Sequence, residues 1–360
     1  MSIQPYVSFV AYFRNDNYTS DFALRVKRAT SCLIGQLQRS KLDAEIILVE
    51  WNPPPEQPLI IDSLDLPPDG GSITVRAVVV DGLHHQGHLG AQERGMYAAK
   101  AANVGLRRAR GRFVTPKASD TYFSNATIKA IARRDLEEAA IYRCDRYDIV
   151  LLTADLETLE GDALLSHLQS LKGTRYSRLQ QPQPWRVRDL HTNACGDFIL
   201  MSRDSWSRVR GFPLDQSILA LDCDSLVMHA AAAFGMHEVC LPASCRVIKG
   251  VHAQLFVNRT TAIWLPWQLW LDDFLAGTGW PRLQTFLRTS FDYPRRRVRG
   301  VESVLGPSVE RNFAKPARRW ARGNTPDPLG PENWGLADEP LDERVLSRAA
   351  WDTATGVTPA

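Results

Sequence analysis

Residues 6–49 decide the fold of this chain, and they read YVSFVAYFRNDNYTSDFALRVKRATSCLIGQLQRSKLDAEIILV. Residues 6–13 are an apolar, β-branched and aromatic run, which predicts a buried strand. A polar loop follows, and apolar residues at helical spacing then predict a helix from Thr19, as its N-cap, to about Ser40. Residues 45–49 predict a second buried strand. A strand, a helix and a strand in this order indicate a parallel pair.

The same alternation continues along the chain. Further strands are predicted over 73–80, 112–115, 141–149 and 196–202, and helices over about 91–110, after Ser124 and over 223–234. This pattern predicts an α/β fold with a mostly parallel, doubly wound, Rossmann-like sheet flanked by helices. Ligands of such sheets bind beyond the carboxyl ends of the strands. We therefore expect the chemistry in the loops that follow residues 13, 49, 80 and 115.

Composition excludes several classes of protein. The 360 residues carry a formal net charge of only +3, with 44% hydrophobic and 23% charged residues, which is typical of a globular enzyme. The six cysteines are scattered without a CxxC pair, which favours a reducing compartment. The sequence shows no export signal and no run of eighteen apolar residues. We therefore expect a cytoplasmic protein.

The character of the chain changes after about residue 262. We expect a catalytic domain over 1–262 and a mostly helical or irregular C-terminal appendage over 263–360. Residues 264–275, WLPWQLWLDDFL, could lie at a membrane surface, with nearby arginines on anionic lipid, or could form a helix that docks on the core. The first alternative implies peripheral contact with the inner face of the membrane. No motif for nucleic-acid binding is present.

Polar side chains follow the first two strands. Neither GxxxxGK[ST] nor GxGxxG is present after the first strand, so a nucleotide would have to be held by side chains at the strand ends. A carboxylate there can accept hydrogen bonds from a base or a ribose. Capping and turn formation is the alternative role. The candidates are Arg14, Asn15, Asp16, Glu50 and Asn52.

The most informative stretch is residues 98–124, AAKAANVGLRRARGRFVTPKASDTYFS. Lys100, Asn103 and Arg107 share one face of its helix, which makes them candidates for donor binding. The helix and the following strand resemble the stretch that precedes the DxD element of family 2 glycosyltransferases of the GT-A fold. In that family the DxD carboxylates hold a divalent metal that bridges the diphosphate of a nucleotide sugar. The resemblance implies that Asp120 is the surviving carboxylate.

A second block strengthens this resemblance. Residues 190–213, LHTNACGDFILMSRDSWSRVRGFP, and 219–239, LALDCDSLVMHAAAAFGMHEV, resemble the acceptor side of a bacterial subgroup with a galactosyltransferase-type C-terminal module. Together the blocks cover about 6–252. Trp206 could stack on a sugar ring or could pack its helix against the sheet. Cys195 is expected to be a small core residue. The residues implied for acceptor binding are His191, Asn193, Asp197 and Trp206.

Asp222 and Asp224 are the candidate catalytic residues. Two positions apart on a helix, their side chains diverge by roughly 200° and cannot both enter one site. Asp222 is a suitable N-cap for the helix that follows. Asp224 matches the carboxylate that the resembling enzymes use as a general base, and the helix N-terminus favours its ionised form.

Asp120 and His252 are the candidate metal ligands. Ser119 stands where a complete DxD would supply another carboxylate, and one carboxylate with one histidine is a poor Mg²⁺ or Mn²⁺ site unless the diphosphate adds oxygens. Lys249 could instead supply positive charge to the leaving diphosphate. The histidine-rich residues 84–88 could bind a metal by composition, but we expect a mobile loop near the donor site.

The resemblance implies a hexosyltransferase-type glycosyltransferase. It would transfer a sugar, with inversion, from a nucleotide-diphosphate sugar to a hydroxyl of a saccharide or lipid-linked saccharide, in surface polysaccharide or glycoconjugate biosynthesis. Asp224 would deprotonate the acceptor. The alternative is a degenerate GT-A module that binds nucleotide or glycan without catalysis. A sugar-nucleotide pyrophosphorylase would need a Gly-rich, lysine-containing loop after the first strand, and RNDNY differs from that.

Overall fold

The structure is a computed structural model. It describes residues 4–16, 19–66, 69–88, 95–176, 190–192, 194–214, 223–251, 316, 319–320, 322–324, 326–349 and 352. Asn193, Asp222, His252 and the tryptophan-rich stretch 264–275 lie outside the described residues, so the predictions made for them stay predictions.

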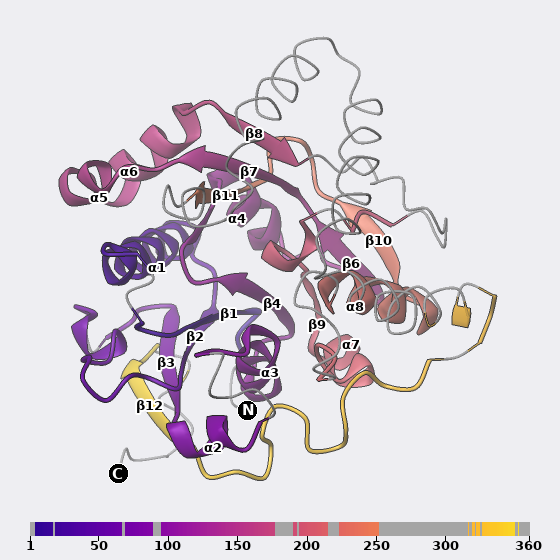
Figure 1. Cartoon of the computed structure of the whole chain (residues 1–360). Helices are drawn as coiled ribbons and strands as arrows, with labels where there is room; N and C mark the ends of the chain where they lie inside the picture. Colours follow the sequence, from indigo (N-terminus) through magenta and orange to yellow (C-terminus); the bar gives the residue numbers. More distant parts are fainter. Residues whose placement is uncertain are drawn as a thin grey trace, which may run out of the picture.

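A six-stranded sheet forms the centre of the fold, in the order β12-β3-β2-β1-β4-β9 (Figure 1). Its four inner strands are mutually parallel: β1 (Val7–Phe13), β2 (Ala44–Trp51), β3 (Ile73–Val80) and β4 (Phe113–Ala118). The short β9 (Met201–Ser202) and β12 (Asp342–Ser347) pair antiparallel at the two edges. The predicted α/β fold with a mostly parallel sheet is confirmed.

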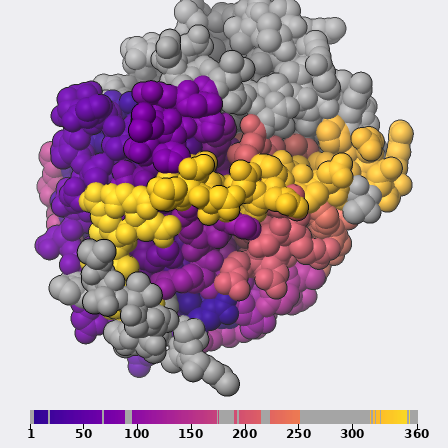
Figure 2. Space-filling view, turned by 90° about the horizontal axis from the view of Figure 1, so that it is seen from below, coloured from indigo at the N-terminus to yellow at the C-terminus, as the bar shows by residue number. Residues whose placement is uncertain are grey.

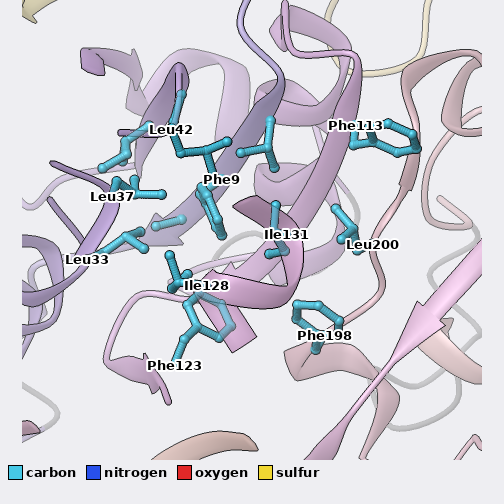
Figure 3. Close-up of a cluster of buried hydrophobic side chains, with 14 of the residues drawn as sticks. Phe9, Leu33, Leu37, Leu42, Phe113, Phe123, Ile128, Ile131, Phe198 and Leu200 are labelled. Atoms are coloured by element: carbon cyan, nitrogen blue, oxygen red, sulfur yellow. The ribbon is translucent and has the colours of Figure 1, made fainter. Parts of the chain in front are cut away.

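Helices cover both faces of this sheet. On one face, α1 (Phe22–Arg39) packs Leu33 and Leu37 near Phe9, in the core shown in Figure 3. On the other face, α3 (Ala98–Arg108) packs against Val10, which points the opposite way because side chains alternate along a strand. A Cβ on Gly105 of α3 would lie 2.3 Å from a Val10 methyl group, so this helix approaches the sheet as closely as glycine allows.

Two smaller sheets extend the fold. Four strands in the order β5-β11-β7-β8 form one of them: β5 (Thr121–Phe123), β11 (Arg246–Val251), β7 (Asp145–Val150) and β8 (Gly173–Tyr176). The other pairs β6 (Ala140–Arg143) with β10 (His237–Cys240). The strand predicted over 141–149 is therefore divided at Cys144 between two sheets. The strand predicted over 196–202 is a 3-10 turn, η2 (Cys195–Asp197), followed by β9.

The remaining helices are short. They are η1 (Ile61–Ser63), α2 (Gly82–Gln86), α4 (Asn125–Ala132), α5 (Thr153–Thr158), α6 (Gly161–Ser170), α7 (Arg203–Val209) and α8 (Cys223–Ala233). The side chains of Ser124 and Ser202 cap α4 and α7. Asp21, and not Thr19, is the N-cap of α1, where its carboxylate pairs with Arg25. No helix in the described ranges is both long and apolar enough to cross a bilayer.

The described C-terminal residues form a band across one face of the molecule (Figure 2). Trp334 in this band is buried, and the Arg108 guanidinium donates to the carbonyl oxygens of Gly335 and Leu336 at 2.6 and 2.9 Å. Further on, β12 pairs with β3. The sequence predicted a mostly helical appendage over 263–360, whereas residues 342–347 of that segment complete an edge of the central sheet. This pairing gives hydrogen-bond partners to backbone N–H and C=O groups at the edge of β3. The local sequence pattern does not predict it, because the two strands are far apart in the chain.

Candidate active site

The carboxyl ends of the parallel strands meet at one edge of the central sheet. In the register, Tyr12 of β1 lies opposite Ala118 of β4, and Phe13 lies opposite Glu50 of β2. The loops after these strands are therefore neighbours, although they are far apart in sequence. This is the edge at which ligands of doubly wound sheets bind.

Three carboxylates from different loops act electrostatically on the hydroxyl group of Tyr12. Asp120 lies in the turn after β4, Asp197 in η2 and Asp224 in the first turn of α8. Burial raises the pKa of Tyr12, and the negative charges of Asp197, Asp224 and Asp120 raise it further. Each of the three carboxylates thus lies close enough to Tyr12 to act on it electrostatically. Tyr12 was not identified from the sequence, where it is one of several aromatic residues of a buried strand.

Asp224 is held by backbone donors and remains partly exposed. Its carboxylate accepts hydrogen bonds from the backbone N–H groups of Gly196 and Ser225 at 2.7 and 2.8 Å. A Cβ on Gly196 would lie 2.8 Å from the carboxylate oxygen, so the absence of a side chain permits this contact. Removal of the carboxylate from bulk water raises the pKa of Asp224, although these hydrogen bonds oppose the shift. A fixed carboxylate with a raised pKa is suited to accept a proton.

Asp197 is ionised and surrounded by cations. Arg146 of β7 lies 2.6 Å from one carboxylate oxygen, and Lys249 of β11 lies 3.4 Å from the other. Burial alone would raise the pKa of Asp197, but the charges of Lys249 and Arg146 outweigh it and lower the pKa. Arg146 also pairs with Asp148 at 2.8 Å. Two cations and two carboxylates therefore form a network beside Asp224.

Lys117 is a buried cation of the same site. It is the charged side chain of the otherwise uncharged β4, it is 2% exposed, and its ammonium group donates to the carbonyl oxygen of Ser119 at 3.1 Å. Burial lowers the pKa of Lys117 to about 8, against the opposing effect of the charges of Asp120 and Asp197. Sequence reasoning did not select Lys117 as a site residue. The signal available was a lysine inside a strand expected to be buried, where charge is costly.

The predicted donor-binding residues that follow the first two strands bind backbone carbonyl groups of neighbouring loops. The Arg14 guanidinium donates to the Asn52 carbonyl oxygen at 2.7 Å and pairs with Asp16 at 3.2 Å. The Asn52 amide donates to the Gly95 carbonyl oxygen at 2.9 Å, and the Asn15 amide donates to that of Pro58 at 2.8 Å. These contacts match the alternative that the sequence left open, in which the residues organise turns.

Glu50 also has a structural role. Its buried carboxylate accepts hydrogen bonds from the backbone N–H groups of Ile60 and Ile61 at 2.9 and 3.2 Å. Burial raises the pKa of Glu50, against the effect of these two hydrogen bonds. The carboxylate therefore closes the loop between β2 and η1. Its role in donor binding stays a prediction.

The three predicted donor ligands on α3 do not act as one surface. The Asn103 amide is buried, donates to the Phe212 carbonyl oxygen at 2.9 Å and accepts from the Phe212 N–H at 2.7 Å. The guanidinium of Arg107 lies 5.4 Å from the ring centroid of Trp334. The ammonium group of Lys100 lies 5.1 Å from the ring centroid of Tyr97. Asn103 and Arg107 thus fasten α3 to neighbouring segments.

On the predicted acceptor side, Trp206 packs α7 against the sheet. Its indole is 1% exposed and donates to the Val114 carbonyl oxygen at 2.9 Å, so the packing alternative describes it and sugar stacking does not. His191 is buried, and its backbone N–H donates to the Glu238 carboxylate at 2.7 Å. Cys195 is buried as expected, and burial raises the pKa of its thiol. Only Asp197 of the described acceptor candidates lies in the carboxylate cluster.

The three aspartates of this sheet edge are not part of a group of close metal-ligating side chains among the described residues. Among them, the one group of three His, Cys or acidic side chains whose ligand atoms lie within 4.8 Å of one another contains none of the three aspartates. Asp197 already faces Arg146 and Lys249, and Lys117 acts electrostatically on Asp120. A divalent ion at this edge would therefore depend on oxygen atoms of the diphosphate for part of its coordination. The predicted pair of Asp120 and His252 stays untested.

The histidine-rich segment forms α2 and packs against Trp51. The Trp51 indole donates to Nδ1 of the buried His85 at 3.0 Å, and His88 stacks on the same indole at a centroid distance of 6.0 Å. Burial lowers the pKa of His88 to about 4, and the neighbouring Lys100, His85 and His84 add to this. The expected mobile loop is therefore a short helix over residues 82–86, anchored by aromatic contacts.

Comparison with known proteins gives distant likenesses. No protein-family model matches the chain, and no curated protein matches it. Similar solved structures include the crystal structure of S. aureus TarS, with a TM-score of 0.39 and 13% identity over 68% of this chain and 36% of that chain. They also include residues 1–349 of TarS, with a TM-score of 0.40, 13% identity and coverage of 67% and 59%. The same portion of TarS in complex with UDP-GlcNAc has a TM-score of 0.42 and 12% identity, over 71% of this chain and 61% of that chain. The chain thus spans less than two thirds of each of these chains.

Proposed function

We propose that the chain is a glycosyltransferase of the GT-A type. It transfers a hexosyl group from a nucleoside-diphosphate sugar to a hydroxyl group of a saccharide or lipid-linked saccharide acceptor. The observation that carries this proposal is the arrangement of Asp224: a partly exposed carboxylate with a raised pKa stands beside Asp120, Asp197 and several cations at the carboxyl edge of a parallel sheet. The sequence blocks that resemble family 2 glycosyltransferases supply these same aspartates.

The reaction is a single displacement that inverts the anomeric centre. Asp224 accepts the proton of the acceptor hydroxyl group as its oxygen attacks the anomeric carbon. The bond between this carbon and the diphosphate oxygen breaks, and its electron pair leaves with the nucleoside diphosphate. Lys117, Lys249 and Arg146 place positive charge in this region, where charge develops on the leaving group. We propose that these cations supply the positive charge that a divalent metal ion would otherwise provide.

The test begins with a thermal-shift screen of UDP-, GDP- and dTDP-sugars, with and without Mn²⁺, followed by transfer assays with the donor that binds. Replacing Asp224 with Asn keeps the shape of the side chain and removes the base. We expect Asp224→Asn to lower kcat by about 10²- to 10⁴-fold, the usual contribution of general-base catalysis, and to leave the donor Kd unchanged.

Asp204→Asn, at an exposed position in the first turn of α7, is the matched control and should retain full activity. Full turnover by Asp224→Asn would refute the assignment of the base. Loss of metal-free activity on EDTA treatment, with recovery on addition of Mn²⁺, would refute the proposal that the cations of the chain replace the metal.

A module that binds a nucleotide sugar without transferring it is the second candidate. The observation in its favour is that Asp197 is already paired with Arg146 and Lys249, and that alanine and serine precede Asp120 at positions 118 and 119. Donor binding by the wild-type chain, with neither transfer nor donor hydrolysis across a panel of saccharide acceptors, would favour this second function. We place either function in surface polysaccharide or glycoconjugate assembly at the inner face of the membrane, on the sequence resemblance alone.

A further inference from the structure

A second group of potential ligands lies outside the carboxylate cluster. Glu238 and Cys240 are two residues apart on β10, so their side chains lie on the same side of this strand. His191 lies against them, since its backbone N–H donates to Glu238 at 2.7 Å and its Nδ1 lies 3.9 Å from the other carboxylate oxygen. One ligand atom from each of the three side chains lies within 4.8 Å of the other two.

The chemistry of these three side chains matches zinc. An imidazole nitrogen, a thiolate and a carboxylate are the ligand types that Zn²⁺ binds in tetrahedral sites, and three protein ligands leave the fourth position to water. His191 is buried, whereas Cys240 is exposed, so solvent reaches the open side of the group. Mg²⁺ and Ca²⁺ prefer oxygen ligands and are not favoured here. A carboxylate and a thiolate together balance the charge of one Zn²⁺ ion.

We propose that His191, Glu238 and Cys240 bind one Zn²⁺ ion, at a site that includes none of the three aspartates of the candidate active site. The site is connected to the candidate active site through Arg143, which is fully buried and donates to the carbonyl oxygens of His191 and Cys195 at 3.3 and 3.1 Å. The next residue, Gly196, donates its N–H to Asp224. Zinc bound to His191 would fix the start of residues 191–197. This segment contains Asp197, and its Gly196 donates the hydrogen bond to Asp224.

Metal binding is tested on the full chain by titration with Zn²⁺ alone, without any sugar nucleotide. We expect one equivalent to bind with release of the Cys240 thiol proton, because only the thiolate ligates. Co²⁺ in place of Zn²⁺ should give a thiolate-to-cobalt charge-transfer band. Cys240 is the exposed one of the six cysteines, so mass spectrometry after iodoacetamide treatment reads its reactivity directly, and bound Zn²⁺ should slow its alkylation by about tenfold or more.

Variants of Cys240 and Glu238 decide whether these side chains bind the ion. Cys240→Ser and Glu238→Gln should each weaken Zn²⁺ binding by about tenfold or more, and Glu238→Gln should abolish protection of Cys240 from alkylation. His237→Ala is the matched control, because His237 is the preceding residue of β10 and its ring pairs with Glu137 at 3.4 Å. It should bind Zn²⁺ as the wild type does. Circular dichroism checks that each variant is folded.

The proposal is overturned if the wild-type chain binds no Zn²⁺, or if binding persists unchanged in folded Cys240→Ser and Glu238→Gln. It is also overturned if Zn²⁺ leaves the alkylation rate of Cys240 unchanged. These measurements read metal binding and thiol reactivity, and none of them depends on glycosyl transfer. Failure of the transferase proposal would therefore not refute the zinc proposal, and failure of the zinc proposal would not refute the transferase proposal.

Discussion

Lys117→Met should make the protein more stable and less active. The lysine is 2% exposed, and its burial lowers its pKa from 10.5 to about 8. At pH 7 the ammonium group is protonated in both the folded and the unfolded chain, so the difference between these values measures the cost of keeping it charged inside the fold. At 1.36 kcal/mol per pKa unit, the cost is about 3 kcal/mol. Methionine has a similar length and carries no charge.

The size of this stability difference changes with pH in a defined window. Because the folded pKa of Lys117 is lower than the unfolded value, the unfolded chain binds more protons between about pH 8 and 10.5. The wild type should therefore gain stability as pH rises through this window, whereas Lys117→Met should not. We expect the variant to have a free energy of unfolding up to about 3 kcal/mol higher at pH 7, with the difference shrinking towards pH 10.5.

Urea denaturation of both proteins at pH 7, 9 and 10.5 measures this difference, and donor binding is measured in parallel. The donor Kd or kcat should worsen in the variant, because a cation beside Asp120 is lost. A variant that is less stable than the wild type at pH 7, or a stability difference that is the same at every pH, would refute this reasoning. Lys129→Met, on the exposed side of α4, is the control and should change neither quantity.

Three further predictions concern other residues of the fold and the site. Turnover should fall as pH is lowered through a value above 3.8, the ordinary pKa of an aspartic acid, because the raised pKa of Asp224 protonates the base early; a profile of kcat/KM that stays flat down to pH 4 would contradict this. Trp206→Phe should cost about 1–3 kcal/mol of stability, through the lost bond to the Val114 carbonyl oxygen, and leave the acceptor KM unchanged; a raised KM at unchanged stability would restore the sugar-stacking alternative. Trp334→Ala should lower the free energy of unfolding by about 3–5 kcal/mol, because a buried indole is removed from the C-terminal band; an unchanged urea midpoint would show that the band does not support the core.

The sequence predicted the order of the main strands and helices correctly, because hydrophobic periodicity is a local property. The apolar runs over 6–13, 45–49 and 73–80 became β1, β2 and β3, and the helical spacing that follows Thr19 became α1. Periodicity failed where a strand changes sheets. The run over 141–149 continues through Cys144 without a break in pattern, yet β6 pairs with β10 and β7 pairs with β11. Pairing of this kind joins distant segments and leaves no local signal.

The residues of the candidate site were also predicted from the sequence only in part. The sequence selected Asp120, Asp197 and Asp224 one by one, and the structure brings all three near Tyr12. Polar residues at strand ends were harder to interpret, since Asn103 and Glu50 have the residue types of ligand-binding groups but bind backbone groups of the chain itself. A side chain and a potential ligand compete for the same hydrogen-bonding capacity, and only the three-dimensional arrangement decides which partner is in reach.

By itself, the sequence determined that a parallel sheet flanked by helices would form and that carboxylates would follow its strands, because both follow from short-range patterns of apolar and polar residues. Only the tertiary structure decided that β12 closes the sheet at β3, that Lys117 is a buried cation and that His191 meets Glu238 and Cys240. These outcomes depend on contacts between segments separated by tens to hundreds of residues. Burial, charge and proximity at such contacts are properties of the packed chain, and no single segment encodes them.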